Sequence, residues 1–204
     1  MANLRAAQKE MTRRRLLSTA LGLFQDKGYV NTTIDEIAAA AGTTRVTFYA
    51  HFPGRDGVMR ALIAELNEVL ERRESQRGST STSLVEAVRV GTTDAIGPWL
   101  AEQIEHWPHI KPYILVATEA AAVDPDLRAV FRAWWNEVLA DIREGLDAAD
   151  RFDAAERPFR AHLAMTLLDQ ANLDWIREGE AETSTRVRTE VLTEAWAGLL
   201  GVGC

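Results

Sequence analysis

Apolar residues recur at helical spacing along almost the whole chain, and this pattern constrains the fold more than any other feature of the sequence. Near the N-terminus the i, i+3, i+4, i+7 rule is followed by Leu17, Ala20, Leu21 and Phe24. This predicts a first helix over residues 7 to 27, which Gly28 ends. No stretch of useful length alternates with the period of two that a strand requires. We therefore expect an all-α fold of about nine helices.

Capping residues and helix breakers set the predicted boundaries of the other helices. Thr33 to Glu36 form a capping box that opens a short helix, and Gly42 ends it. A third helix over 44 to 50 ends at Pro53-Gly54, a fourth reaches about residue 73, and residues 76 to 83 are linker-like. Pro108 and Pro112 should interrupt the chain. The remaining predicted helices lie at 84 to 105, 113 to 122, from Pro125 to about 146, 157 to 177 and 183 to 200.

Charge is distributed unevenly along the chain. The 204 residues carry a net charge of -7, which by itself argues against a nucleic acid partner. Residues 1 to 60, however, hold nine Lys and Arg against five Asp and Glu, a net charge of +4, whereas the remaining 144 residues hold 14 against 25, a net charge of -11. A basic segment beside an acidic body is typical of a chain whose basic part binds a polyanion.

Composition excludes several other classes of protein. Hydrophobic residues at 47% and charged residues at 26% are ordinary for a globular domain. No apolar run approaches the ~18 residues of a membrane span. The single cysteine, Cys204, excludes an internal disulfide framework. Because no secretory signal is visible, we expect a cytoplasmic protein without a membrane partner.

Residues 33 to 52 carry the strongest functional signal. Two short helices joined through Gly42, with small residues such as Ala38 between them, are typical of a helix-turn-helix unit. Hydroxyl groups bind phosphates or base edges, arginine binds guanine through two hydrogen bonds, and tyrosine donates to phosphate. The predicted DNA contacts are Thr33, Thr43, Thr44, Arg45, Thr47, Phe48, Tyr49, His51 and Arg55, with phosphate-tracking charge from Arg13, Arg14 and Arg15.

Some of these residues have a packing role as the alternative. Phe48 either packs in the core or contacts a thymine methyl group, and His51 either donates to phosphate or packs. Phe52 is expected in the core. The arginine triplet is also compatible with an ordinary solvated surface.

Around this segment the sequence resembles the TetR family of bacterial transcription regulators. The matching residues are Phe24, Gly28, Tyr29, Thr32, Thr33, Ile37, Ala38, Ala41, Gly42, Thr47, Tyr49, His51, Phe52 and Arg55. Val46, Thr44 and Arg55 stand where the family commonly has glycine, serine and lysine. The resemblance implies a three-helix DNA-binding head over residues 1 to 55, a connecting helix over about 56 to 75, and a ligand-binding and dimerisation body over 76 to 204.

The last two predicted helices, 157 to 177 and 183 to 200, hold more apolar residues than one core-facing stripe needs, which supports a homodimer through them. Pocket and core are alternative roles for each aromatic residue of the body. The predicted ligand contacts are Trp99, Trp107, Tyr113, Phe131, Trp134, Trp135, His162, Asn172 and Trp175. His106 and His109 flank Pro108 and lack the geometry of a metal pair, so no metal or cofactor is expected.

These features together predict a sequence-specific DNA-binding regulator, a repressor released from a palindromic double-stranded operator by a small hydrophobic or aromatic effector. An enzyme is the first alternative. The chain holds no Gly-x-Ser-x-Gly, P-loop, dinucleotide glycine, Ser-x-x-Lys or His-Glu-x-x-His motif, which argues against catalysis. An adaptor that has lost DNA binding is the second alternative, and Thr33, Arg45, Thr47 and Tyr49 argue against it.

Overall fold

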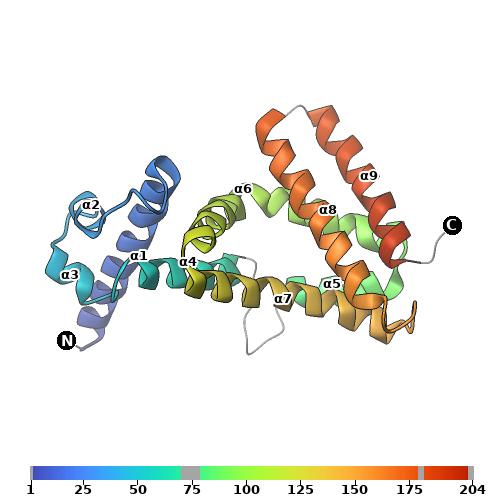
Figure 1. Ribbon diagram of the computed structural model, residues 1–204, viewed down its shortest axis with the longest axis horizontal. Helices are drawn as coiled ribbons and strands as arrows, with labels where there is room; N and C mark the ends of the chain where they lie inside the picture. The colour runs from blue at the N-terminus through green and yellow to red at the C-terminus, as the bar shows by residue number, and fades with distance from the viewer. Residues whose placement is uncertain (1, 70–78, 179–181, 202–204) are drawn as a thin grey trace. The chain divides into compact units, whose positions relative to one another are not determined.

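The computed structural model describes the backbone of residues 2–69, 79–178 and 182–201, and the side chains of residues 4–66, 83–172 and 185–201. Within these ranges the chain forms nine α-helices and no strand, so the all-α prediction is confirmed (Figure 1). The helices are α1 (Ala2–Lys27), α2 (Ile34–Ala40), α3 (Arg45–Tyr49), α4 (Arg55–Val69), α5 (Ser79–Val90), α6 (Thr93–Val123), α7 (Pro125–Ala148), α8 (Arg157–Glu178) and α9 (Glu182–Leu200).

Two predictions for the middle of the chain are wrong. The single helix expected over 84 to 105 is divided between α5 and α6, because Gly91 adopts a φ of +71° and turns the chain between them. The interruptions expected at Pro108 and Pro112 do not occur, since both prolines lie inside α6. Each proline removes only one backbone hydrogen bond, and buried apolar residues such as Ile104 and Ile114 hold the helix on either side.

The chain divides into two compact units. Met1–Val69 and Ile110–Trp134 form unit 1, and Leu70–His109 and Trp135–Cys204 form unit 2. Helices α6 and α7 therefore contribute residues to both units. The functional division at residues 55 and 76 stays a prediction. Of the expected linker, residues 79–83 begin α5, whereas 76–78 lie outside the described residues, as does the predicted end of the fourth helix near residue 73.

Unit 1 is held together by an apolar core among its short N-terminal helices. Helix α1 packs against α2 and α4, and α2 packs against α3. The Phe24 ring lies edge-on to Tyr29 at 5.2 Å, and Phe48 contacts Phe52 at 5.9 Å between ring centroids. Fully or almost fully buried side chains of this core are Leu16, Leu17, Ala20, Phe24, Ile37, Phe48, Phe52, Met59 and Leu62. This packing fixes α3 on the surface of the unit.

Unit 2 contains α8 and α9 as a packed, antiparallel pair (Figure 1). The buried Trp196 of α9 stacks on Trp99 of α6, with 5.4 Å between ring centroids. Arg151 donates to the carbonyls of Val88 at 3.0 Å and Leu200 at 2.8 Å. This arginine therefore joins the C-terminal ends of α5 and α9, whose carbonyls have no partner within their own helices.

Candidate nucleic-acid interface

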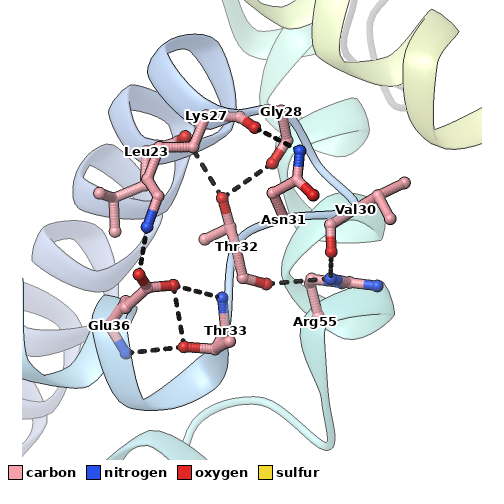
Figure 2. A network of polar contacts seen from close by, with 9 residues as sticks. All are labelled: Leu23, Lys27, Gly28, Val30, Asn31, Thr32, Thr33, Glu36 and Arg55. Atoms are coloured by element: carbon pink, nitrogen blue, oxygen red, sulfur yellow. Dashed lines mark hydrogen bonds and ion pairs between the residues drawn. The ribbon is translucent and has the colours of Figure 1, made fainter.

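The N-terminal end of α2 is fixed by reciprocal hydrogen bonds between Thr33 and Glu36 (Figure 2). Thr33 Oγ1 accepts from the Glu36 amide at 3.2 Å, and Glu36 Oε2 accepts from the Thr33 amide at 2.9 Å. The predicted capping box is confirmed. Glu36 also pairs with Lys27 at the end of α1. The bond from Lys27, followed by those from Thr33, lowers the pKa of Glu36 to about 2, so this carboxylate stays ionised and ties α1 to α2.

Arg55, at the start of α4, anchors the segment between α1 and α2 (Figure 2). Its Nη1 donates to the carbonyl of Val30 at 2.8 Å and to that of Thr32 at 2.9 Å. The guanidinium also lies 4.3 Å from the centroid of the Tyr29 ring. The buried Thr32 returns a hydroxyl bond of 2.9 Å to the Gly28 carbonyl. Arg55, predicted as a DNA contact, is thus engaged in holding this segment.

Glu119 of α6 binds the same segment. Its Oε1 accepts from the Tyr29 amide at 3.0 Å. Gly28 has a φ of +86°, a conformation that favours glycine, and a Cβ there would lie 2.7 Å from Glu119 Oε1, so the Glu119 carboxylate would have to shift. The two partners are 90 residues apart in the sequence, and no local pattern indicated the contact.

The turn before α3 is built by Gly42 and Thr44. Gly42 adopts a φ of +63°, which suits a glycine that ends a helix. Thr44 is the N-cap of α3, and its Oγ1 accepts from the Thr47 amide at 3.2 Å. The two hydroxyl groups of Thr44 and Thr47 lie 3.0 Å apart and are hydrogen-bonded to each other. These threonines therefore set where α3 begins.

Helix α3 has a buried face and an exposed face. Phe48 has no exposed surface, whereas Tyr49 is 45% and Val46 is 80% exposed. Arg45 Nη1 binds Asp35 Oδ2 of α2 at 2.9 Å, and Arg45 Nη2 lies 3.5 Å from the Tyr49 hydroxyl. The exposed face thus combines a cation, a phenol and an apolar side chain. Val46 was not among the predicted DNA contacts. Its exposure could have been inferred from the sequence, because residues two apart, such as Val46 and Phe48, lie on opposite faces of a helix.

The structure sorts the predicted DNA contacts by exposure. Phe48 is a core residue, which corrects its place among the DNA contacts, because no surface remains for a thymine methyl group. Thr33, Thr44, Arg45 and Tyr49 are exposed. Thr43, Thr47, His51 and Arg55 are half-buried. Contact with DNA stays a prediction for all of these except Phe48.

His51 lies at the end of this motif with its Nδ1 buried and without a hydrogen-bond partner. Burial, followed by the charges of Lys9 and Arg13, lowers the pKa of His51 below its usual 6.5. The ring is therefore neutral at pH 7. This environment favours the packing alternative over a cationic phosphate contact.

The α1 arginines differ from one another. Arg13 is half-buried, with its guanidinium 4.7 Å from the centroid of the buried Phe52 ring. Arg14 pairs with Glu10 at 2.9 Å on the exposed surface, and Arg15 is exposed. Phosphate tracking by this triplet stays a prediction.

The predicted ligand contacts are divided between the two units. Tyr113, Phe131 and Trp134 belong to unit 1, where the Phe131 and Trp134 rings stack at 5.7 Å. Trp99, Trp107, Trp135, His162 and Asn172 belong to unit 2. The Trp99, Trp107, Trp134 and Asn172 side chains are buried, those of Tyr113, Phe131 and Trp135 are half-buried, and that of His162 is exposed. The Trp175 side chain lies outside the described residues.

Four buried side chains of unit 2 hold polar atoms without a hydrogen-bond partner. They are Gln103 Nε2 and Trp107 Nε1 of α6, Asn172 Oδ1 of α8 and Trp196 Nε1 of α9. Buried polar groups in proteins are nearly always hydrogen-bonded, so each such atom calls for an explanation. Three of the atoms are donors and one is an acceptor. These four atoms are thus exceptions in an interior that is mostly apolar.

A surface hollow of about 580 Å³ also lies on unit 2, lined by residues of α7 and α8 that include Arg143, Phe159 and His162. His162, a predicted ligand contact, therefore faces this hollow rather than the buried interior. Among the described residues, no group of three His, Cys, Asp or Glu side chains is placed to hold a metal ion. Nor does any helix there have the length and apolar character to cross a bilayer.

The head matches a known family in sequence. Residues 16–62 fit the family described as bacterial regulatory proteins, tetR family. SrpR of Pseudomonas putida, an HTH-type transcriptional regulator, is 41% identical over 71 residues, which are 35% of this chain and 33% of SrpR. The chain thus matches about a third of that relative's length.

Solved structures share the fold over nearly the whole chain. A structure assigned to the TetR family, from Mesorhizobium loti, has a TM-score of 0.70 at 18% identity and covers 95% of this chain and 98% of its own. A complex of SmeT with triclosan has a TM-score of 0.65 at 17% identity and covers 91% of each chain. Residues 16–62 therefore belong to the TetR family of bacterial regulatory proteins, and the chain as a whole shares the fold of these solved structures.

Proposed function

We propose that this chain is a transcriptional regulator that binds operator DNA through α3. The proposal rests on the exposed face of the five-residue helix α3, whose N-terminal end is capped by Thr44. Thr44 caps α3, while Thr33 caps α2 and Arg55 holds the segment before it. Val46 and Tyr49 of α3 project into solvent. A rigid scaffold that presents a short helix suits insertion into the major groove. The net charge of +4 over residues 1 to 60 favours approach to DNA.

In this proposal Arg45 makes the polar contact with DNA. Its ion pair with Asp35 leaves 59% of the arginine and 65% of the aspartate side chain exposed. Exposed pairs of this kind contribute only about 0 to 1 kcal/mol, so DNA can replace Asp35 at little cost. The guanidinium fork then matches the two acceptors of guanine or a phosphate. In the free protein, Asp35 and Tyr49 keep the fork near the surface that faces DNA.

We further propose a homodimer through α8 and α9. Both helices expose large apolar side chains that one chain leaves uncovered, with Phe159 65% and Val191 59% exposed. Leu167 and Val187 extend this surface. A two-fold interface would cover these residues and join two heads, each of which reads one half of a palindrome.

The effector site we propose uses the unpartnered atoms of unit 2. Leaving a polar group buried and unsatisfied costs about 1 to 3 kcal/mol, so a ligand that supplies partners recovers this free energy. Gln103 and Trp107 are four residues apart on one face of α6, and both offer donors. An aromatic effector that carries acceptor atoms would satisfy them. SmeT, which shares this fold, forms a complex with triclosan, and this supports an aromatic ligand here.

Repression and release complete the proposal. The free dimer occupies the operator, and the effector favours a conformation that binds it less well. A difference of about 3 kcal/mol between the two conformations lowers operator affinity more than a hundredfold. A regulator of chromosomal DNA works in the cytoplasm, in line with the predicted location.

The deciding experiment is selection of bound duplexes from a random library with the full chain. A palindromic consensus is expected, and Arg45→Ala should weaken binding to it by about 1 to 3 kcal/mol. Arg89→Ala is the matched control, because Arg89 is an exposed arginine of α5 paired with Glu86 at 2.6 Å and lies outside the head and the proposed dimer surface. No enriched site for the wild-type chain would contradict the proposal.

The dimer and the effector site have separate tests. Sedimentation at micromolar concentration should give a dimer, and a monomer would contradict the interface. For the effector, Asn172→Leu removes the unpartnered acceptor while it keeps the volume of the side chain. This variant should melt at a higher temperature than the wild type when ligand-free and should bind triclosan, the first probe, less tightly. An unchanged triclosan affinity would remove Asn172 from the site.

A further inference from the structure

We propose that Val46 reads a thymine in each half of the operator by placing its methyl groups against the C5-methyl group of that base. This inference rests on the proposed DNA-binding function and adds a base preference to it. Val46 belongs to the five-residue helix α3 and follows its first residue.

Exposure singles out Val46. At 80% it is the most exposed large apolar side chain among the described residues, above Leu4 and Phe159 at 65% each. Its methyl groups gain free energy when they are removed from water, so a partner that covers them binds more tightly. The rest of the exposed face of α3 is polar, which shows that the surface is otherwise built for solvent.

Helix geometry directs Val46 outward. Residues two apart on a helix point about 200° from each other, so Val46 lies nearly opposite Phe48. Phe48 is fully buried and marks the direction of the core of unit 1. Val46 therefore projects from the side of α3 farthest from the core. Residues at the N-terminal end of a recognition helix are the ones that contact base edges.

The neighbouring polar groups are engaged within the protein, whereas Val46 is not. Arg45 binds Asp35 at 2.9 Å, and the Thr44 and Thr47 hydroxyls bind each other at 3.0 Å. These groups must exchange a protein partner for DNA. Val46 has no hydrogen bond to lose, so its contribution comes from burial of apolar surface alone.

The major groove offers one apolar group for such a contact. Guanine, cytosine and adenine present hydrogen-bond donors and acceptors there, and only thymine adds a methyl group. A valine side chain that enters the groove without a hydrogen-bonding atom is therefore complementary to thymine. Contact with the sugar-phosphate backbone would carry no base preference, and this difference makes the two cases separable.

The test replaces the thymine methyl group and the valine methyl groups in turn. In the site selected by the wild-type chain, each thymine pair related by the two-fold axis is changed to deoxyuridine, which removes only the C5-methyl group. Affinities are measured for the wild type and for Val46→Ala. Val30→Ala is the matched control, since Val30 is another exposed valine of the head, 51% exposed and outside α3.

At one thymine pair, deoxyuridine should weaken wild-type binding about tenfold. The substitution removes one buried methyl group from each half of the site, and each loses the free energy usual for burial of such a group. Val46→Ala should be weakened less than twofold by the same change, while Val30→Ala should respond as the wild type does. Circular dichroism checks that the helical content is retained. Equal responses of wild type and Val46→Ala at every thymine, or no response at any of them, would overturn the inference while the selected site upholds the DNA-binding function. Failure to select any site would instead overturn the proposed function itself.

Discussion

A substitution of Arg55 can distinguish a residue that stabilises the head from a residue that contacts DNA. We predict that Arg55→Met lowers the stability of unit 1 first and its DNA affinity as a consequence. The guanidinium binds the Val30 and Thr32 carbonyls at 2.8 and 2.9 Å and covers the buried Tyr29 ring. Methionine keeps much of the side-chain volume and makes none of these polar contacts.

The magnitude follows from the three contacts. For a half-buried guanidinium that solvent still screens, we take each of its two hydrogen bonds at about 1 kcal/mol, the central value for a hydrogen bond in a protein. The contact with the aromatic ring at 4.3 Å adds about 0.5 to 1 kcal/mol. The expected loss is therefore about 3 kcal/mol. In a chain of this size, that corresponds to a fall of about 6 to 12 °C in melting temperature.

The assay is calorimetric melting of the free protein, combined with operator affinity over a series of salt concentrations. Arg60→Met is the control, because it removes the same charge from the same helix. Arg55→Lys should lie between wild type and Arg55→Met, since a lysine keeps the charge but not the fork that reaches two carbonyls. An Arg55→Met protein that melts within about 1 °C of wild type but loses about one unit of salt slope would refute the anchoring role and identify a phosphate contact.

Two further predictions concern the same junction. Because the pKa of Glu36 falls from its usual 4.5 to about 2 on folding, its stabilising contribution is complete above pH 4.5 and is lost as the pH falls toward 2. The difference in melting temperature between wild type and Glu36→Gln should therefore vanish over that interval, and a constant difference would contradict the lowered pKa. Gly28→Ala should destabilise by more than about 1 kcal/mol because of its positive φ and the 2.7 Å approach of Glu119. Gly22→Ala, where a Cβ meets nothing within 4 Å in the interior of α1, should instead stabilise by about 0.5 to 1 kcal/mol, and denaturant unfolding that shows the same sign for both would contradict this account.

Local signals were sufficient for the head. The Thr33 and Glu36 side chains each bind the other residue's backbone amide, three residues away, so their spacing predicted the start of α2. Gly42 likewise ends α2 through its own backbone conformation. Fold class followed from periodicity for the same reason, because an apolar stripe depends on residues within two turns of one another.

Features that depend on distant residues were not predicted. The Tyr29 amide is bound by Glu119, 90 residues along the chain, and no local pattern announces such a pair. Pro108 and Pro112 are breakers by propensity, yet packing of α6 overrides them. Whether an aromatic such as Trp107 lines a pocket or fills a core was likewise undecided by spacing, since both require the same buried face.

Several residues that the sequence predicts as DNA contacts also stabilise the helix-turn-helix itself. Thr33 and Thr44 cap α2 and α3, and Arg55 holds the segment between α1 and α2. In the proposed function, loss of any of them should weaken DNA binding even where the side chain never touches DNA, because the helix-turn-helix is then less firmly held. Changes made in the DNA escape this ambiguity, since removing a base methyl group or raising the salt concentration leaves the free protein intact. For Val46 a substitution in the protein is as informative as a change in the DNA. At 80% exposure its side chain does not stabilise the free head, so its loss should affect DNA binding alone.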